Sequence, residues 1–201
     1  TIRGRRKIIE DPEIRTGFIK RFLEPFLKEF GNHPAVFGFD VINEPEWLVA
    51  KADGGGWEDV NPKHRPETPV SLDALKSFIN ACAASVRSIC PGKFVTVGIS
   101  CVHLELTKDL DMDYTSAHWY PYMGDLSDNL AKIPQNKPYI LEEFPGKDEL
   151  GSIFNAVKKN GGAGALLWNL RPASDDQCYR WNQEEAKLNS IRQFVEAVKN
   201  E

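Results

Sequence analysis

Carboxylic acids, a histidine and aromatic rings recur in this sequence at the ends of short apolar runs. Glu44 follows the run at 35–42, and Glu143 comes near the end of the run at 138–144. The other side chains of this kind at such ends are Asn43, His118, Tyr120 and Trp168. Because the carboxyl ends of parallel strands open onto one face of an α/β protein, we expect these side chains to gather on that face.

Two carboxylic acids on different strands of one face form the pair that cleavage of a glycosidic bond requires. One must be protonated to help the leaving oxygen depart, and the other must be ionised to attack the anomeric carbon. A separation of about 5–5.5 Å allows the second acid to form a covalent intermediate. Different surroundings push the pKa values of the two acids apart and so assign their roles.

The elements that would position these side chains alternate along the chain between helical stripes and short apolar runs. Such alternation is typical of βα units with a parallel sheet. The predicted strands are 35–42, 94–99, 114–119, 138–144 and 163–168. The predicted helices are 11–30, 71–90, 126–132, a segment through 153–157, and 188–198.

The first two predicted helices carry start signals. Asp11, followed by a proline, and Ser71 are N-cap candidates, and Gly31 ends the first helix. Pro25 inside that helix predicts a kink. Four-residue spacing places one stripe of apolar side chains along it, made of Ile14, Phe18, Phe22, Phe26 and Phe30.

The segment from His33 to Pro45, which contains Asp40-Val41-Ile42-Asn43-Glu44-Pro45, resembles the fourth strand of glycoside hydrolase family 5 and its clan A relatives. These are retaining (β/α)8-barrel enzymes that act on β-linked glycans. The resemblance implies that Glu44 is the acid/base and that Asn43 contacts the substrate 2-hydroxyl. It also implies that Glu143, which precedes an aromatic residue, is the nucleophile.

Two later motifs extend the resemblance over about residues 11–200. His118 and Tyr120 match a His-x-Tyr on strand six, where the tyrosine hydrogen-bonds the nucleophile. Trp168 matches the aromatic residue of strand eight on which the sugar lies. The expected partner is therefore an oligo- or polysaccharide, and no cofactor or metal is expected.

Several of these residues also fit a purely structural role. Glu44 could be an exposed carboxylate at the start of a helix. Adjacent strand residues point to opposite faces, so either Glu142 or Glu143 faces the site, and the resemblance favours Glu143. His118 could be a buried core histidine, and Trp168 could serve packing alone.

A long loop is predicted over 46–70, and loops of that length inside a compact domain are usually functional. Trp47 and Trp57 could line a sugar subsite there, or fold onto their own domain. Further side chains that could reach the substrate are His103, Glu105, Asp175 and Asp176.

The length disagrees with a complete barrel, which takes about 250 residues and eight strands. The 201 residues supply five predicted strands, equivalent to strands four to eight, and 4–10 is predicted to be the loop after strand three. An arginine and a histidine of the family's earlier strands have no counterpart. We therefore expect 1–201 to be a single, partial barrel domain, completed by a missing N-terminal part or by self-association. The alternatives are a catalytically silent fragment that binds glycan or self-associates, and a flavodoxin-like sheet.

The charge balance excludes other partner classes. The chain carries 25 basic and 29 acidic residues, a net charge of −4, which offers no basic field for nucleic acid or an anionic membrane. The family resemblance implies an extracellular or periplasmic location. The cysteines are too few for a disulfide scaffold, and free thiols or one disulfide stay open for Cys82, Cys90, Cys101 and Cys178.

Overall fold

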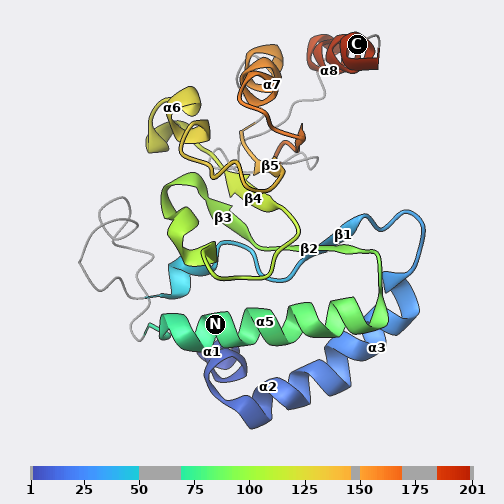
Figure 1. Ribbon diagram of the computed structural model, residues 1–201, viewed down its shortest axis with the longest axis vertical. Coiled ribbons are helices and arrows are strands. Elements are labelled where there is room, and N and C mark those ends of the chain that lie inside the picture. Colours follow the sequence, from blue (N-terminus) through green and yellow to red (C-terminus); the bar gives the residue numbers. More distant parts are fainter. Residues whose placement is uncertain (1, 50–68, 146–149, 169–184, 200–201) are drawn as a thin grey trace. The chain divides into compact units, whose positions relative to one another are not determined.

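The computed structural model describes residues 2–49, 69–145, 150–168 and 185–199 (Figure 1). The chain forms two compact units, Thr1–Tyr114 and Thr115–Glu201. Strands pair in parallel within each unit, which confirms the predicted α/β class with parallel sheets. The prediction that residues 1–201 make one partial barrel domain stays a prediction.

The first unit begins with a run of helical segments. Helix α1 spans Ile2–Glu10 and α2 spans Pro12–Phe18. A π-helical turn at Ile19–Leu23, the short helix α3 at Glu24–Phe26 and a second π-helical turn at Leu27–Gly31 then follow one another directly. The run ends at Gly31, as the sequence predicts.

The two predicted N-caps are present. The Asp11 carboxylate accepts the backbone N–H groups of Glu13 and Ile14 at 2.9 and 3.1 Å. The Ser71 hydroxyl accepts the N–H of Ala74 at 3.1 Å at the start of α5, Leu72–Ile89. Each cap satisfies donors that the first helical turn leaves without a partner, which fixes where the helix starts.

The irregularity expected at Pro25 takes the form of two π-helical turns, which flank the three-residue α3. Proline lacks the N–H that would continue the helical ladder, and its ring crowds the carbonyl one turn earlier. Widening the neighbouring turns accommodates this misfit, as π-bulges do in other helices.

The strands of the first unit are short. Strand β1, Gly38–Asp40, pairs in parallel with β2, Phe94–Thr96, and Gly38 lies opposite Phe94. Strand β3 spans Gly98–Ser100, so the strand predicted at 94–99 is divided in two. Two 3₁₀ segments follow strand ends, at Pro45–Leu48 and Cys101–Thr107.

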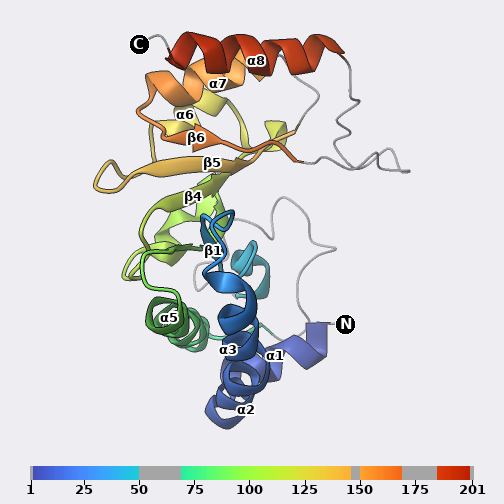
Figure 2. The same cartoon turned by 90° about the vertical axis from the view of Figure 1, so that its right-hand side faces the viewer.

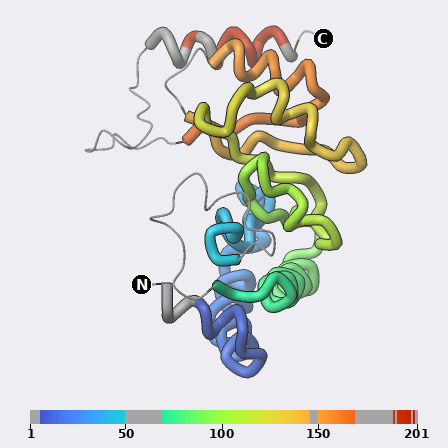
Figure 3. Tube along the Cα trace, turned by 90° about the vertical axis from the view of Figure 1, so that its left-hand side faces the viewer, coloured from blue at the N-terminus to red at the C-terminus, as the bar shows by residue number. Residues whose placement is uncertain are grey.

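Helix α5 is the centre of packing in the first unit, where α1, α3 and the π-helical turns lie along it (Figure 3). Its apolar stripe is buried, with Leu75, Ile79 and Val86 at 1% exposure or less. Among the described residues, no helix combines the length and the apolar character that crossing a bilayer needs.

One prediction for this unit is wrong. The sequence predicts a loop over 4–10, but these residues belong to helix α1. Ile9 is 2% exposed in the core, and Ile8 packs against that core. The charged residues between Arg3 and Lys7 interrupt the apolar pattern of this segment in the sequence. The segment is helical because its few apolar side chains pack against α5.

Three phenylalanines of the stripe along the first helical run stay at the surface. Phe22, Phe26 and Phe30 are 60%, 43% and 54% exposed. Their rings contact one another in sequence, with centroids 6.4 Å apart for Phe22 and Phe26 and 5.4 Å apart for Phe26 and Phe30. We call this set the aromatic row.

The second unit is a parallel sheet with helices packed on it (Figure 2). Strand β5, Tyr139–Glu143, lies between β4, Thr115–His118, and β6, Gly164–Ala165. Helix α7, Leu150–Lys159, packs on β6 and on α8, Glu185–Lys199. The connection from β4 to β5 contains a 3₁₀ turn, Pro121–Met123, and helix α6, Leu126–Leu130.

Three of the four cysteines fall within the described residues, and Cys82, Cys90 and Cys101 are free and buried. Cys178 lies outside the described part of the chain. Burial raises the pKa of the Cys82 thiol from 9.0 to about 11, an effect that the nearby Arg15 charge partly opposes. Burial also raises the pKa of the Cys90 thiol.

We expect Cys82 to lower the stability of the chain at alkaline pH. The folded state holds the thiol protonated up to about pH 11, whereas the unfolded state releases that proton from about pH 9. The contribution is therefore complete below pH 9 and is lost as the pH rises through 11. Thermal unfolding midpoints measured across this range should fall more steeply for the wild type than for Cys82→Ala. Equal slopes would contradict the assignment.

Candidate active site

The turn that carries Asn43 and Glu44 follows β1 directly in the first unit. Glu44 has φ 45° and ψ 56°, and Asp109 is the only other non-glycine residue with positive φ among the described residues. A side chain held in this left-handed conformation costs about 1–3 kcal/mol and persists only where its surroundings enforce it. The Glu44 N–H donates to the Gly98 carbonyl at 2.8 Å, which ties the turn to β3.

A second hydrogen bond to β3 involves Glu46, two residues further on. Its side chain is buried, at 4% exposure, and its Oε1 accepts the N–H of Ser100 at 2.9 Å. Backbone and side chain thus bind this turn to both ends of β3. No local pattern indicates this role, because burial of a glutamate after Asn-Glu-Pro follows from tertiary packing.

We expect Glu46→Ala to lower the free energy of unfolding by about 1–3 kcal/mol, since it leaves the buried Ser100 N–H without this acceptor. Glu46→Gln retains an acceptor oxygen of the same reach and should lose less. The exposed Glu29, changed to alanine, is the matched control. Urea unfolding measures the three effects, and faster amide exchange at Ser100 in Glu46→Ala alone locates the change. Equal losses of unfolding free energy in Glu46→Ala and Glu29→Ala would contradict a stabilising role for the Glu46–Ser100 hydrogen bond.

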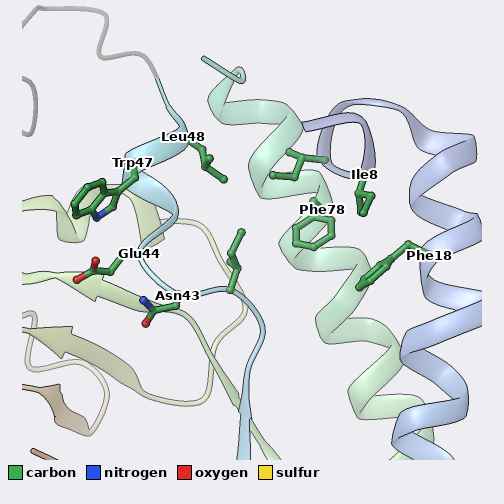
Figure 4. A pocket seen from close by; sticks show the side chains of 9 residues that line it. Ile8, Phe18, Asn43, Glu44, Trp47, Leu48 and Phe78 are labelled. Atoms are coloured by element: carbon green, nitrogen blue, oxygen red, sulfur yellow. The ribbon is translucent and has the colours of Figure 1, made fainter. Parts of the chain in front are cut away.

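Asn43, Glu44 and Trp47 line a pocket of about 540 Å³ within the first unit (Figure 4). Figure 4 shows the Asn43 and Glu44 side chains on one side and the Phe18 and Phe78 rings on the other. The apolar lining consists of Ile8, Ile9, Phe18, Ile42, Leu48 and Phe78. Glu44 is half-buried and Asn43 is exposed, so both can meet a molecule that enters from solvent.

In the second unit, a register shift between β4 and β5 sets the position of Glu143. Ala117 lies opposite Leu141, but the next residue, His118, lies opposite Glu143. Glu142 is therefore the additional residue of a bulge, a feature that is common beside active sites because it re-aims side chains. The Trp119 N–H donates to the Glu143 carbonyl at 2.9 Å and holds the strand end in place.

Two side chains meet the Glu143 carboxylate. The Tyr120 hydroxyl donates a hydrogen bond to Oε1, and Nδ1 of His118 lies 3.5 Å from Oε2. All three residues are buried, at 8% exposure or less. A hydrogen bond to the ionised form of a carboxylate favours that form. The arrangement holds the carboxylate in one orientation.

Glu142 lies in different surroundings. Tyr139, Leu141 and Glu143 alternate as buried residues along β5, and Glu142 is half-buried between them. The Ser116 hydroxyl donates to the Glu142 carboxylate. The two adjacent glutamates therefore have separate partners, and the one with a tyrosine and a histidine is Glu143.

No protein-family model matches the chain. The chain is 21% identical over 207 residues to a mannan endo-1,4-β-mannosidase of Mytilus edulis, over 83% of this chain and 54% of that protein. A solved structure, the β-mannanase of the blue mussel Mytilus edulis, superposes with a TM-score of 0.70 at 18% identity, over 92% of this chain and 60% of that one. The chain has the fold of the family 5 mannanases.

A GH5_18 variant from Streptomyces cattleya, solved in complex with Manβ1-4GlcNAc, shares this fold at 13% identity and a TM-score of 0.62. That match covers 92% of this chain and 51% of the other. The chain thus spans between 51% and 60% of the length of these relatives. The predicted partial match to a (β/α)8 barrel is confirmed, and the flavodoxin-like alternative is not.

The mannanase-like fold places Trp168 beside the end of β5. The backbone N–H of Trp168 donates to the Phe144 carbonyl at 2.9 Å, and Trp168 forms an isolated parallel β-bridge with Pro145. The side chain is 43% exposed, so packing alone does not account for it. Within the second unit, this segment, His118 and Tyr120 all lie at the strand ends near Glu143.

The remaining candidates divide into two groups. His103 is buried in the first unit with Nδ1 3.6 Å from the exposed Glu105 carboxylate, so the pair is explained by its own segment. Candidates that lie outside the described residues are Trp57, Asp175 and Asp176.

Proposed function

We propose that this chain carries the catalytic residues of a retaining β-mannanase, with Glu143 as nucleophile and Glu44 as acid/base. The observation that carries the proposal is the Glu143 carboxylate at a parallel strand end, with the Tyr120 hydroxyl on Oε1 and His118 at Oε2. The left-handed Glu44, held to β3 after Asn43, supports it in the first unit, because such strain clusters at active sites.

The proposed reaction proceeds in two displacements. Protonated Glu44 gives its proton to the glycosidic oxygen as the bond from that oxygen to the anomeric carbon breaks, while a Glu143 oxygen bonds to that carbon. Ionised Glu44 then takes a proton from water, the water oxygen bonds to the anomeric carbon, and the ester to Glu143 breaks. Two inversions retain the anomeric configuration. Tyr120 keeps the nucleophile in one rotation during both steps.

The proposed substrate is a β-1,4-linked mannan, the substrate class named for the Mytilus edulis relative. Asn43 contacts the 2-hydroxyl of the reacting sugar, and Trp168 offers a ring face for it. The exposure of Asn43 and Trp168 in the structure is compatible with both contacts.

A fluoride-activated 2-deoxy-2-fluoro-β-mannoside tests the proposal, since the fluorine slows the second displacement and traps the ester. Peptide mass spectrometry of the treated chain should find the label on Glu143. Hydrolysis of β-1,4-mannan and of carboxymethyl cellulose, with Glu44→Gln as the contamination control, separates the substrates. A label on another residue, or a folded chain that takes no label, refutes the proposal.

A second candidate function is that of a catalytically silent fragment that binds glycan or self-associates. The observation that favours it is the exposed aromatic row of the first unit. Large exposed apolar patches commonly mark interaction surfaces. Measured turnover that Glu44→Gln abolishes would exclude this candidate.

We expect the chain to self-associate through the aromatic row. Size-exclusion chromatography with light scattering should then give a mass above the 22.7 kDa of one chain. Phe26→Ser should shift the mass toward that of one chain, because Phe26 contacts both neighbours in the row. Phe37→Ser is the control, at a phenylalanine outside the row that is 59% exposed against 43% for Phe26. A wild-type chain that elutes as a cooperatively folding monomer contradicts the expectation.

A further inference from the structure

Tyr122 is an exposed aromatic ring close to the candidate nucleophile in the second unit. Its side chain is 48% exposed. Its ring is parallel to that of Tyr120, with an interplanar angle of 3° and centroids 5.8 Å apart. The Tyr120 hydroxyl donates to the Glu143 carboxylate, so the Tyr122 ring stacks on a side chain that contacts the candidate nucleophile directly.

The turn that carries Tyr122 is tied down on several sides. The Met123 N–H donates to the Tyr120 carbonyl at 2.8 Å, and the Trp119 indole donates to the Gly124 carbonyl at 3.0 Å. The Asn129 amide donates to the Met123 carbonyl at 3.0 Å. Gly124 has φ 93° and ψ −163°, a conformation essentially restricted to glycine, and it closes the turn. A ring on so constrained a backbone is positioned before any ligand arrives.

We propose that Tyr122 is a stacking platform for a pyranose ring of the substrate, in the subsite next to the sugar attached to Glu143. The proposal rests on the proposed function for its ligand class, a neutral β-linked oligosaccharide. One pyranose face presents C–H groups, which pack on an aromatic face, while the hydroxyls at its rim stay hydrated. A tyrosine that is already stacked loses little side-chain entropy when it binds.

The composition of this turn favours an uncharged ligand over a charged one. Residues 119–124 read Trp-Tyr-Pro-Tyr-Met-Gly and contain no ionisable group apart from the two phenols. The platform thus offers ring faces and no charge to pair with a phosphate, a carboxylate or a cation. A neutral saccharide fits such a surface better than a charged polymer does.

Binding and kinetics together test the platform. Isothermal titration with mannopentaose and cellopentaose should show binding to the wild-type chain that weakens about tenfold in Tyr122→Ala, while Tyr122→Phe binds as the wild type does. In kinetic assays, Tyr122→Ala should raise KM for mannopentaose by about the factor by which binding weakens, because the platform binds the sugar equally in the ground state and in the transition state. Phe37→Ala is the matched control, because it removes an exposed ring of the first unit that contacts Phe94 in a tilted arrangement, with centroids 4.8 Å apart.

Each outcome decides the proposal. It is overturned if the wild-type chain binds neither pentasaccharide, if Tyr122→Ala binds as tightly as the wild type, or if Tyr122→Phe fails to restore binding. Should Tyr122→Ala unfold, the contrast between Tyr122→Phe and Tyr122→Leu decides. Binding that depends on Tyr122 without any label on Glu143 refutes the proposed function alone, and a labelled Glu143 with unchanged Tyr122→Ala binding refutes the platform alone.

Discussion

Glu143→Ala is expected to lower kcat for an aryl β-mannoside by roughly 10⁴-fold or more, as loss of a nucleophile does in other covalent catalysts. No other described carboxylate receives the Tyr120 hydroxyl, so nothing replaces the lost oxygen at the anomeric carbon. Glu142 cannot substitute, since it is held by Ser116. Steady-state kinetics of the purified variant measures the loss.

An added nucleophile separates this role from general damage. The space left in Glu143→Ala admits azide, which attacks the anomeric carbon and yields an α-mannosyl azide, the product of a single inversion. Glu142→Ala is the matched control, at the neighbouring position of the same strand, and should keep most of its activity. Comparable losses in Glu142→Ala and Glu143→Ala, or a β-azide product, would assign the nucleophile elsewhere.

Local signals sufficed for much of the fold. Asp11 and Ser71 are side chains that satisfy orphan N–H groups, and both caps form at the predicted positions. The apolar stripe of α5 is read from residues three and four apart, and it is the buried face. Such features depend on neighbours within one turn, which a sequence displays directly.

Features that depend on distant packing were missed. Helix α1 is too short to be stable alone, so its existence rests on α5, and no local pattern announces that. Glu46 reads as a surface carboxylate until Ser100 is seen to donate to it. Tyr122 differs from any loop tyrosine only because its ring lies against Tyr120.

In the candidate site too, some features follow from local sequence and others only from the packing of distant segments. Alternation along a strand says that Glu142 and Glu143 differ in environment, and family resemblance favours Glu143. Neither source contains the register shift that sets His118 opposite Glu143, because a bulge is a property of two paired strands. The sequence Tyr-Pro-Tyr at 120–122 indicates a turn that carries two aromatic rings, but it does not predict that the rings stack on each other.

Replacement of Glu44 is expected to slow the hydrolysis of mannan strongly, because it removes the proposed acid/base. Loss of a general acid/base costs about 10²–10⁴-fold, so Glu44→Ala should be that much slower on mannan. A 2,4-dinitrophenyl β-mannoside needs no proton on its leaving group, so its first displacement should proceed nearly as in the wild type. Azide should then speed the second displacement and give a β-mannosyl azide, after two inversions. An equal loss on both substrates would contradict the acid/base role.

The left-handed backbone of Glu44 separates catalysis from stability at this one position. Glycine adopts φ 45° without penalty, whereas alanine does not. Glu44→Gly should therefore be as slow as Glu44→Ala on mannan, yet exceed Glu44→Ala in free energy of unfolding by about 1 kcal/mol. Urea unfolding of the two variants measures that difference, and equal stabilities would mean that the turn relaxes when the carboxylate is removed. A glutamate kept where glycine fits better is the mark of a residue retained for its carboxyl group, at a cost to the fold.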